Sequence, residues 1–572
     1  MIGLKINEVS KLLGLNLKTI SVYESKGLLC VPRQNNSYRE YSAEDVRELR
    51  IIKALRTLGI GISDIKLYRH GVVSLRELLC GRMAELSDEK ALHSRQMSAC
   101  QALLPEAERG DALLEQWEGS GEEPLPETEG EPDDITEPVT VGIDIGTTTL
   151  SVVVLGADSG SSYDCFNVRN PGGADPVMAS DGRQEPAAIL QKIREILDII
   201  RHTYRILSVG LTGQMHGILY VDADGQAVSE LFTWQNRSGL LPIDGETCCE
   251  AIRRKSGENV PAGYGLATHY YLFHTGRVPE QAASLCTVMD YLGMQLCGRS
   301  RPLVHCSNAA SLGFFDIRSS TFRTEALQKA GLDPSILPDV TADNAQLGDW
   351  DGVPVWVALG DNQASFLGAV GLVPHSALIN IGTGSQISVL CPSLPSDTEG
   401  FEIRPLIDGQ YLKCYSALCG GAAYAALENF FRRLVVLAGG ENDELYDLLE
   451  RMADSALHEP SELCVRPCFN GTRTDPTQRA SVTGLSLGNF TPEQLTLGML
   501  RGIAGELYEQ YRRLPEQREV RLLAASGNAV RRNRVLRQIL CDTFGMEPVI
   551  PDVLEEAAVG AARFAGRQAQ AL

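Results

Sequence analysis

The residues best suited to chemistry stand at the ends of apolar runs. Gly146-Thr147-Thr148 follows the run Val139–Ile145, and Asp144 stands just before this turn. A turn rich in glycine and hydroxyl groups exposes backbone N–H groups that hold phosphate oxygens. A carboxylate beside such a turn is placed to hold Mg²⁺ or a water bound to it. For one turn of this kind, an ordinary β-hairpin is the simpler interpretation.

A second copy of the pattern favours the phosphate-binding turn over an ordinary hairpin. Residues 377–390 again contain an apolar run that enters a turn, Gly382-Thr383-Gly384, and an apolar run that leaves it. A strand–turn–strand unit used twice in one chain indicates a duplicated α/β domain. We therefore expect two lobes that close on a nucleotide from both sides.

Polar and aromatic residues follow another apolar run, residues 206–211. Gln214 and His216 come directly after it, and Trp234 follows within a second polar stretch, residues 233–237. Open α/β sheets bind their ligands at the carboxyl ends of the strands. A lone histidine is more often a satisfied structural residue, but these neighbours favour contacts to the hydroxyl groups of a sugar.

Asp361 ends a further buried run, residues 353–359, and allows two interpretations. It suits the N-cap of a following helix, a role worth about 1 kcal/mol. It also suits the base that orients and deprotonates a hydroxyl nucleophile. Position alone leaves both open.

Composition describes an ordinary globular protein of several domains. The 572 residues are 44% hydrophobic and 22% charged, which is typical of soluble chains. No apolar run approaches the roughly 20 residues of a membrane helix, so we expect no membrane partner. Fifteen cysteines show no regular framework, which favours reduced thiols and a cytoplasmic location.

Charge is unevenly spread along the chain. The net charge is −21, yet residues 1–70 hold 12 Lys and Arg against 7 Asp and Glu. Residues 111–137 hold 11 acids and no base. A basic head on an acidic body indicates that the head has a polyanionic partner.

The head has the pattern of a helix-turn-helix. Ile6–Leu13 has helical spacing and ends at Gly14, and Asn16 is a suitable cap for a second helix, Leu17–Ser25. A turn-rich wing, residues 31–41, follows. A small interaction module with a solvated basic face is the alternative interpretation. The side chains expected to project toward DNA from the second helix and the wing are Lys18, Thr19, Ser21, Tyr23, Tyr38 and Arg39.

Residues 1–70 resemble the MerR family of transcription regulators. The resemblance rests on Thr19-Ile20, Tyr23-Glu24, Gly27-Leu28-Leu29 and Tyr38-Arg39-x-Tyr41-Ser42. It implies an all-α winged helix-turn-helix that binds double-stranded DNA as a homodimer, paired through a connecting helix in residues 71–118. The family usually has an arginine and an aromatic residue where this chain has Ser21 and Val22.

An acidic linker, residues 119–138, separates the head from the rest. It is rich in Pro, Gly and like charges, and such composition disfavours a packed core and extends the chain. We expect two independently folded halves.

Residues 139–566 resemble the FGGY family of carbohydrate kinases over nearly their whole length. The Gln-Met-His-Gly sequence at 214–217 is typical of its ketose kinases, and Ser-Gly-Asn-Ala at 526–529 is most similar to sedoheptulokinases. The motifs that carry the resemblance are Asp144-x-Gly146-Thr147-Thr148, Gly213-Gln214-Met215-His216-Gly217, Gly360-Asp361-Asn362-Gln363, Gly382-Thr383-Gly384 and Ser526-Gly527-Asn528-Ala529.

The resemblance implies an α/β, actin-like (ribonuclease-H-like) fold with lobes at residues 139–373 and 374–572 that close over ATP and sugar. Asp361 would take the proton from a terminal sugar hydroxyl, and Asp144 would hold Mg²⁺. The implied ATP contacts are Gly146, Thr147, Thr148, Gly382, Thr383, Gly384, Gly527 and Asn528. The implied sugar contacts, besides Asp361, are Gln214, Met215, His216 and Trp234. The family's usual spacing around Trp234 is not kept, since Asn236 and Arg237 stand there.

Two functions fit this sequence. The first is an ATP-dependent ketose kinase whose DNA-binding head couples sugar status to transcription. The second is a sugar-sensing regulator whose kinase-fold body binds ligand without catalysis. A pure sensor has no need of Asp361, Asp144 and both Gly-Thr turns, so their presence favours the kinase.

Overall fold

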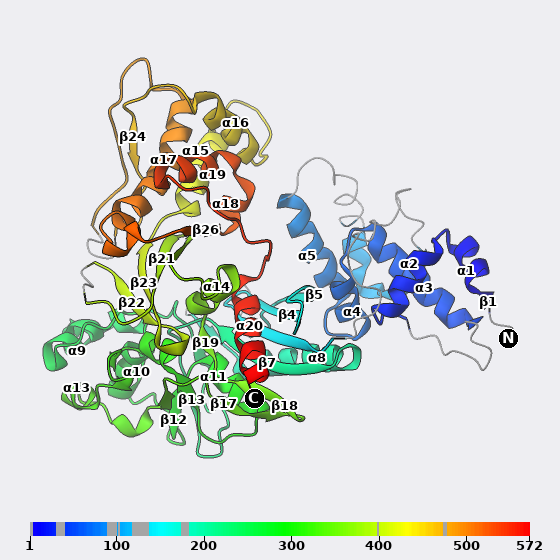
Figure 1. The fold of residues 1–572 in the computed structure, drawn as a ribbon, viewed down its shortest axis with the longest axis horizontal. Coiled ribbons are helices and arrows are strands. Elements are labelled where there is room, and N and C mark those ends of the chain that lie inside the picture. Colours follow the sequence, from blue (N-terminus) through cyan, green and yellow to red (C-terminus); the bar gives the residue numbers. More distant parts are fainter. Residues whose placement is uncertain are drawn as a thin grey trace.

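The computed structural model describes residues 4–29, 40–88, 100, 103–116, 137–172, 182–396, 400–472 and 477–571. Figure 1 shows two lobes stacked on one another and a smaller helical head that lies against the side of one lobe. The predicted combination of a helix-turn-helix head and a two-lobed α/β body is confirmed. Residues 31–39 of the predicted wing, including Tyr38 and Arg39, lie outside the described residues, and its last two residues form the short strand β2 (Glu40–Tyr41), which pairs with β1 (Leu4–Lys5).

The head begins as its capping residues predict. Asn16 Oδ1 accepts the N–H of Thr19 at 2.6 Å and so caps the second helix. Gly14 takes a left-handed conformation, φ +63°, and ends the first. The helices share one apolar core. They are α1 (Ile6–Leu13), α2 (Leu17–Ser25), α3 (Ala43–Thr57), α4 (Ile62–Arg69) and α5 (Leu75–Asp88).

The described part of the predicted connecting helix, residues 71–118, is not one continuous helix. It contains α5, a 3₁₀ turn η1 (Leu104–Arg109) and a short helix α7 (Asp111–Gln116). Leu114 is fully buried in the head core, and Arg69 Nη1 bonds Asp111 at 2.9 Å. This segment therefore closes the head against α3, and pairing with a second subunit stays a prediction.

The first lobe is built on one mixed sheet. Its strand order is β17-β18-β7-β3-β4-β5, with β19 also beside β7. The strands β3, β7, β18 and β19 run parallel. Their bounds are β3 (Val139–Ile145), β4 (Thr149–Gly156), β5 (Ser162–Arg169), β7 (Ile206–Gly213), β17 (Gln346–Trp350), β18 (Val353–Trp356) and β19 (Leu359–Gly360).

Helices cover both faces of this sheet. Successive residues of a strand face opposite ways, and on β7 Leu211 approaches α11 (Val288–Leu296) while Gly210 faces α20 (Glu556–Ala571). The helices α8 (Pro186–Thr203) and α11 lie on one face, and α14 (Asp361–Ala369) and α20 lie on the other. Residues 218–340 add a second core that includes α9 (Cys248–Ser256), α10 (Gly265–His274) and α13 (Thr324–Lys329).

The second lobe has a smaller sheet of order β22-β23-β21-β20-β26. Its helices pack over their own apolar core. The strands are β20 (Ser376–Ile381), β21 (Ser385–Cys391), β22 (Glu402–Pro405), β23 (Tyr411–Ala417) and β26 (Leu522–Ser526). The main helices are α15 (Gly421–Leu437), α16 (Tyr446–Ala456), α17 (Pro492–Tyr511), α18 (Asn528–Arg532) and α19 (Arg534–Phe544). Among the described helices, none has the length and apolarity needed to cross a membrane.

The last helix differs from the predicted division of the lobes. The predicted second lobe, residues 374–572, includes α20, but this helix returns to the first lobe and packs on β3, β7 and α14 (Figure 1). The approach is close because glycines line it. A Cβ on Gly560 would lie 1.8 Å from the carbonyl oxygen of Ala364, and one on Gly368 would lie 1.8 Å from that of Glu556.

We expect Gly560→Ala to destabilise the protein by about 2 kcal/mol or more, because the new methyl group meets backbone that cannot move aside. Chemical denaturation gives the change in unfolding free energy. Gly505→Ala is the matched control, since Gly505 lies in α17 with open space around it, and there alanine is neutral or stabilising. Equal stability of the two variants would show that the α14–α20 contact is looser than described.

Candidate active site

The parallel strands bring three predicted site residues to one edge of the first-lobe sheet. Asp144 on β3 pairs with Thr212 on β7, and Gly213 on β7 pairs with Gly360 on β19. Gln214 and Asp361 are the residues that directly follow these strand ends. The structure therefore brings Asp144, Gln214 and Asp361 together, although they are far apart in the sequence.

Asp361 is the first residue of α14, and Gly360, not Asp361, is the N-cap. Its carboxylate accepts the N–H of Asn362 at 2.6 Å. Burial raises the pKa of Asp361, and the nearby Arg404 guanidinium opposes that rise. The N-cap interpretation is therefore wrong for Asp361. Of the two interpretations, the general base remains.

Asp144 is a half-buried carboxylate among other carboxylates. Burial, together with the charges of Asp361 and Glu555, raises its pKa to about 8. Within the described ranges, no three His, Cys, Asp or Glu side chains form a ready-made metal site. Mg²⁺ commonly binds through one or two carboxylates plus substrate phosphates, and this arrangement fits such a cation because it would relieve the repulsion.

The first Gly-Thr turn is tied to the sugar-side residues by hydrogen bonds. Trp234 Nε1 donates to Thr147 Oγ1 at 3.0 Å, and Thr147 Oγ1 donates to Gln214 Oε1 at 3.3 Å. Gln214 Nε2 donates to Gln184 Oε1 at 2.8 Å, and Gln184 Nε2 donates to the Thr147 carbonyl at 2.7 Å. Thr147, Gln214 and Gln184 thus form a closed polar ring to which Trp234 donates, so the predicted phosphate turn and the predicted sugar contacts share one polar network.

His216 has an unusual backbone conformation, φ +75°. Its ring stacks on Tyr264, with centroids 4.4 Å apart, and its Nδ1 lies 2.9 Å from the Ser311 carbonyl oxygen. A carbonyl oxygen only accepts, so Nδ1 carries the proton in this contact. Trp234 is 42% exposed. A stacked ring pair and an exposed indole provide flat surfaces of the kind that pack against a sugar ring.

Met215, unlike Gln214 and His216, contacts the end of β19. Its side chain is buried, and its sulfur lies 2.7 Å from the position that a Cβ on Gly360 would take. Its described contact is therefore with the strand end that carries Asp361.

Two residues near the base, Arg404 and Tyr264, were not found from the sequence, and Gln363 was named only as part of the motif around Asp361. Arg404 is a buried side chain of β22, and its Nη2 bonds Glu402 at 2.9 Å. Tyr264 OH donates to Glu402 at 3.4 Å. Gln363, on α14, donates to the Pro405 carbonyl at 3.1 Å, so a strand of the second lobe reaches the helix that Asp361 begins. No local sequence signal connects Arg404 or Tyr264 with Asp361.

The second Gly-Thr turn joins β20 to β21 and is held by the start of α15. Gly421 N–H donates to the Gly382 carbonyl at 2.7 Å, and Ala422 N–H donates to the Thr383 carbonyl at 3.0 Å. The half-buried Gly384 completes this turn, and Thr383 is exposed.

Gly527 lies beside this turn because β20 and β26 are parallel neighbours, with Asn380 opposite Ser526. Its φ is +91°, and a Cβ there would lie 2.5 Å from the Ile381 carbonyl oxygen. Only glycine fits that position. Asn528 follows it as the exposed first residue of α18.

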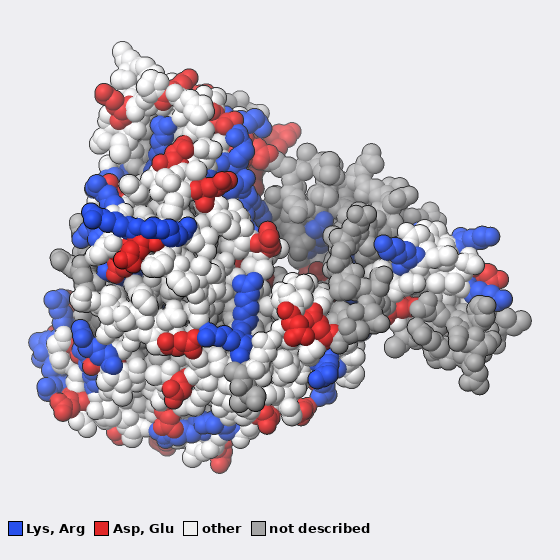
Figure 2. Space-filling model, viewed as in Figure 1, with Lys and Arg blue, Asp and Glu red and all other residues white. Residues whose placement is uncertain are grey.

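The predicted DNA-contacting residues of α2 divide into two groups. Lys18 is exposed, and Thr19 and Ser21 are partly exposed. Tyr23 is fully buried in the head core, so the prediction that it projects toward DNA is wrong. It lies three positions after the buried Ile20 and so shares the inward face of the helix. Figure 2 shows Lys and Arg side chains at the end of the head away from the lobes.

Family profiles match the parts of this chain in order. Residues 4–71 match the MerR HTH family of regulatory proteins. Residues 139–368 match the N-terminal domain of the FGGY family of carbohydrate kinases, and residues 408–569 match its C-terminal domain.

Known proteins agree with these matches. The chain is 30% identical over 474 residues to a sedoheptulokinase of Mus musculus, which covers 75% of this chain and 97% of that protein. A sedoheptulokinase of Homo sapiens is also 30% identical, over 74% of this chain and 96% of its own length. A solved xylulose kinase of Rhodospirillum rubrum has the same fold, with a TM-score of 0.63, 22% identity and coverage of 75% and 90%. The chain belongs to the FGGY family of carbohydrate kinases and is a sugar kinase that carries a MerR-type helix-turn-helix head.

Proposed function

We propose that this protein transfers the γ-phosphoryl group of ATP to a terminal hydroxyl of a ketose similar to sedoheptulose, and that its head binds double-stranded DNA. The observation that carries the kinase assignment is the placement of Asp144 and Asp361 at the ends of β3 and β19, which both pair with β7, beside a Gly-Thr turn. Because its described cysteines are free thiols, we place the reaction in the cytoplasm.

Each residue at the sheet edge has a role in this proposal. Asp361 accepts the proton of the attacking hydroxyl, and its buried carboxylate is a stronger base than an exposed one. Asp144 would hold Mg²⁺, which neutralises charge on the transferred phosphoryl group when bound. The turns at Thr147 and Thr383 contribute N–H and hydroxyl donors to the phosphates. Thr148, Gly527 and Asn528 complete the proposed nucleotide contacts.

The sugar would lie against the polar ring and the aromatic surfaces of the first lobe. Gln214, His216 and Trp234 supply the hydrogen-bonding groups and the flat faces. The two relatives at 30% identity are both named sedoheptulokinases, which supports a ketose over glycerol.

The alternative is a regulator whose kinase-fold body binds sugar without turnover. It would account for the head but not for the paired carboxylates, because a binding site gains nothing from like charges that repel. Retained catalysis is therefore the stronger proposal.

Purified protein with Mg²⁺-ATP is expected to phosphorylate one of sedoheptulose, xylulose or ribulose. Asp361→Asn should lower kcat by 10²-fold or more, because the general base is lost, while the nucleotide dissociation constant stays within about twofold. Coupled ADP release measures turnover, and calorimetry measures binding. Asp224→Asn, an exposed loop change, is the control. Binding of sugar with no turnover of any of the three would favour the sensor.

Asp144→Asn is expected to stabilise the ligand-free protein while abolishing turnover. The raised pKa means that the folded state opposes ionisation of Asp144, which costs stability as pH rises from about 4 to about 8. The unfolding free energy of the variant should thus equal that of the native protein at pH 4, exceed it by a few kcal/mol at pH 8, and keep that difference at higher pH. Thermal midpoints at several pH values measure this. A difference in stability that does not change with pH would contradict the raised pKa of Asp144.

The full chain is expected to select a two-fold symmetric site from a random duplex DNA library, since paired helix-turn-helix heads read palindromes. Lys18→Ala should weaken binding and lower its salt dependence by about one phosphate contact. Lys329→Ala, an exposed change in the first lobe, should alter neither. Selection of no sequence, with equal binding by both variants, would reject a DNA role for α2. Analytical ultracentrifugation tests the proposed homodimer.

A further inference from the structure

The head is fixed to the first lobe by a buried ion pair. Lys66 Nζ on α4 lies 2.6 Å from Asp164 Oδ2 on β5, and the two side chains are only 3% and 4% exposed. Ser63 Oγ donates to the other carboxylate oxygen at 2.9 Å, and Tyr204 OH donates to Asp164 as well. We call these four residues the joint. A buried carboxylate with three partners from two folding units specifies one position of the head.

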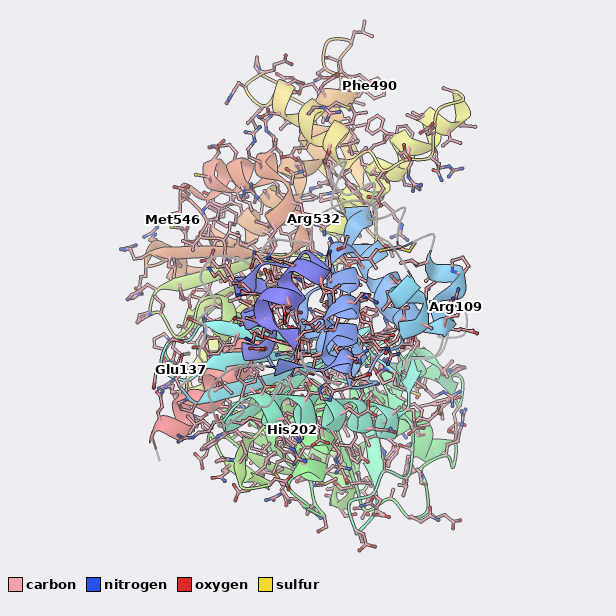
Figure 3. The ribbon with its side chains drawn as sticks, turned by 90° about the vertical axis from the view of Figure 1, so that its right-hand side faces the viewer. Arg109, Glu137, His202, Phe490, Arg532 and Met546 are labelled. Carbon is pink, nitrogen blue, oxygen red and sulfur yellow. The ribbon has the colours of Figure 1, made fainter. Side chains whose placement is uncertain are left out.

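Apolar contacts extend the joint. Leu67 and Val72 belong to the head by sequence but are buried in the first-lobe core. Lys192 on α8 donates to the Val72 carbonyl. Figure 3 looks onto the head and shows it in front of the strands and α8 of the first lobe, with His202 labelled near the end of α8.

A second contact with the first lobe involves the turn after the helix that would read DNA. Gly27 lies two residues after the end of α2, and a Cβ there would lie 3.5 Å from Thr203 Oγ1 at the end of α8. The turn that follows the proposed DNA-contacting helix therefore lies close to the kinase lobe, so the orientation of this helix depends on how the head is docked.

The strand that carries Asp164 leads to the first phosphate turn. Asn170 follows β5, and its N–H donates to the Thr148 carbonyl at 2.8 Å. Its side chain donates to the Gly146 carbonyl at 2.8 Å and contacts Gln184 at 3.4 Å. Six residues of extended chain, about 20 Å, thus connect the joint to the turn and to the polar ring.

β5 is well placed to respond at both ends, because it is the edge strand of its sheet. Among the described strands its neighbour is β4 alone, and α4 of the head lies beside it. The position of an edge strand depends on fewer ladder bonds than that of a central strand. Ordering the turn at one end of β5 therefore limits the motion of Asp164 at the other.

We propose that nucleotide bound at the Gly146–Thr148 turn tightens the docking of the head through β5, and so couples nucleotide occupancy to DNA binding. The inference rests on the proposed nucleotide site. Such a coupling is reciprocal, so a docked head raises the affinity for nucleotide by the same factor that nucleotide raises docking.

Amide hydrogen exchange of the full chain tests this without knowledge of the operator. With a saturating, non-hydrolysable ATP analogue and Mg²⁺, exchange of the α4 amides, residues 62–69, should slow about 5-fold or more. Calorimetry in the same buffer shows whether the analogue binds. No binding would overturn the proposed function and the coupling together. Binding with unchanged α4 exchange would overturn the coupling alone.

Variants locate the effect at the joint. Lys66→Glu opposes Asp164 with a like charge, so α4 should exchange rapidly with or without the analogue, and nucleotide should bind about 5-fold more weakly. The charge swap Lys66→Asp with Asp164→Lys should restore both values toward those of the native chain. It also keeps the test decisive if Lys66→Glu does not fold. Arg201→Gln is the control, because it breaks an exposed α8 pair, Arg201–Asp351, outside the joint. The role of the joint would be overturned if the analogue no longer slowed α4 exchange in Arg201→Gln. It would also be overturned if the analogue still slowed α4 exchange in Lys66→Glu.

Discussion

The parallel pairing that places Asp144 and Asp361 at the same end of the sheet is the constraint on which the active site depends. Burial raises the pKa of both carboxylates, and the charge of Asp361 raises that of Asp144 further. A protein keeps such a pair only where the surrounding structure prevents the two groups from moving apart. Here parallel pairing of β3, β7 and β19 fixes the backbone at both positions.

The close packing of α14 and α20 supplies the stiffness that this arrangement needs. Asp361 begins α14, so any movement of that helix moves the proposed base. Gly368 and Gly560 let the two helices cross with their backbones in contact. The sheet also approaches α20 closely at Gly142 and Gly210. Helix and sheet thus form one rigid block under the active site, while β22 of the other lobe reaches it from the opposite direction.

The head is held in a fixed position on the same lobe. An exposed salt bridge contributes little to a fixed geometry, but a buried pair leaves a desolvated charge when it opens. Lys66 and Asp164 are therefore a strong constraint on orientation, whatever their net contribution to stability. The acidic linker led us to expect two independently folded halves, yet the buried surfaces of Leu67 and Val72 make the head part of the first-lobe core. Residues 119–136 of the predicted linker lie outside the described residues, and the joint supplies the described contacts that relate the head to the kinase.

The sequence by itself determined the local elements and the family. Asn16 and Gly14 set helix ends, Val- and Ile-rich runs set the strands, and Gly-Thr turns with Asp361 identified the chemistry, because caps, periodicity and turn residues act over a few neighbouring positions. Only the tertiary structure decided that Tyr23 faces inward, that α20 returns to the first lobe, and that Arg404 and the Lys66–Asp164 pair lie where they do. Those contacts join residues tens to hundreds of positions apart, and burial within a packed core, which has no local signature in the sequence, selects them.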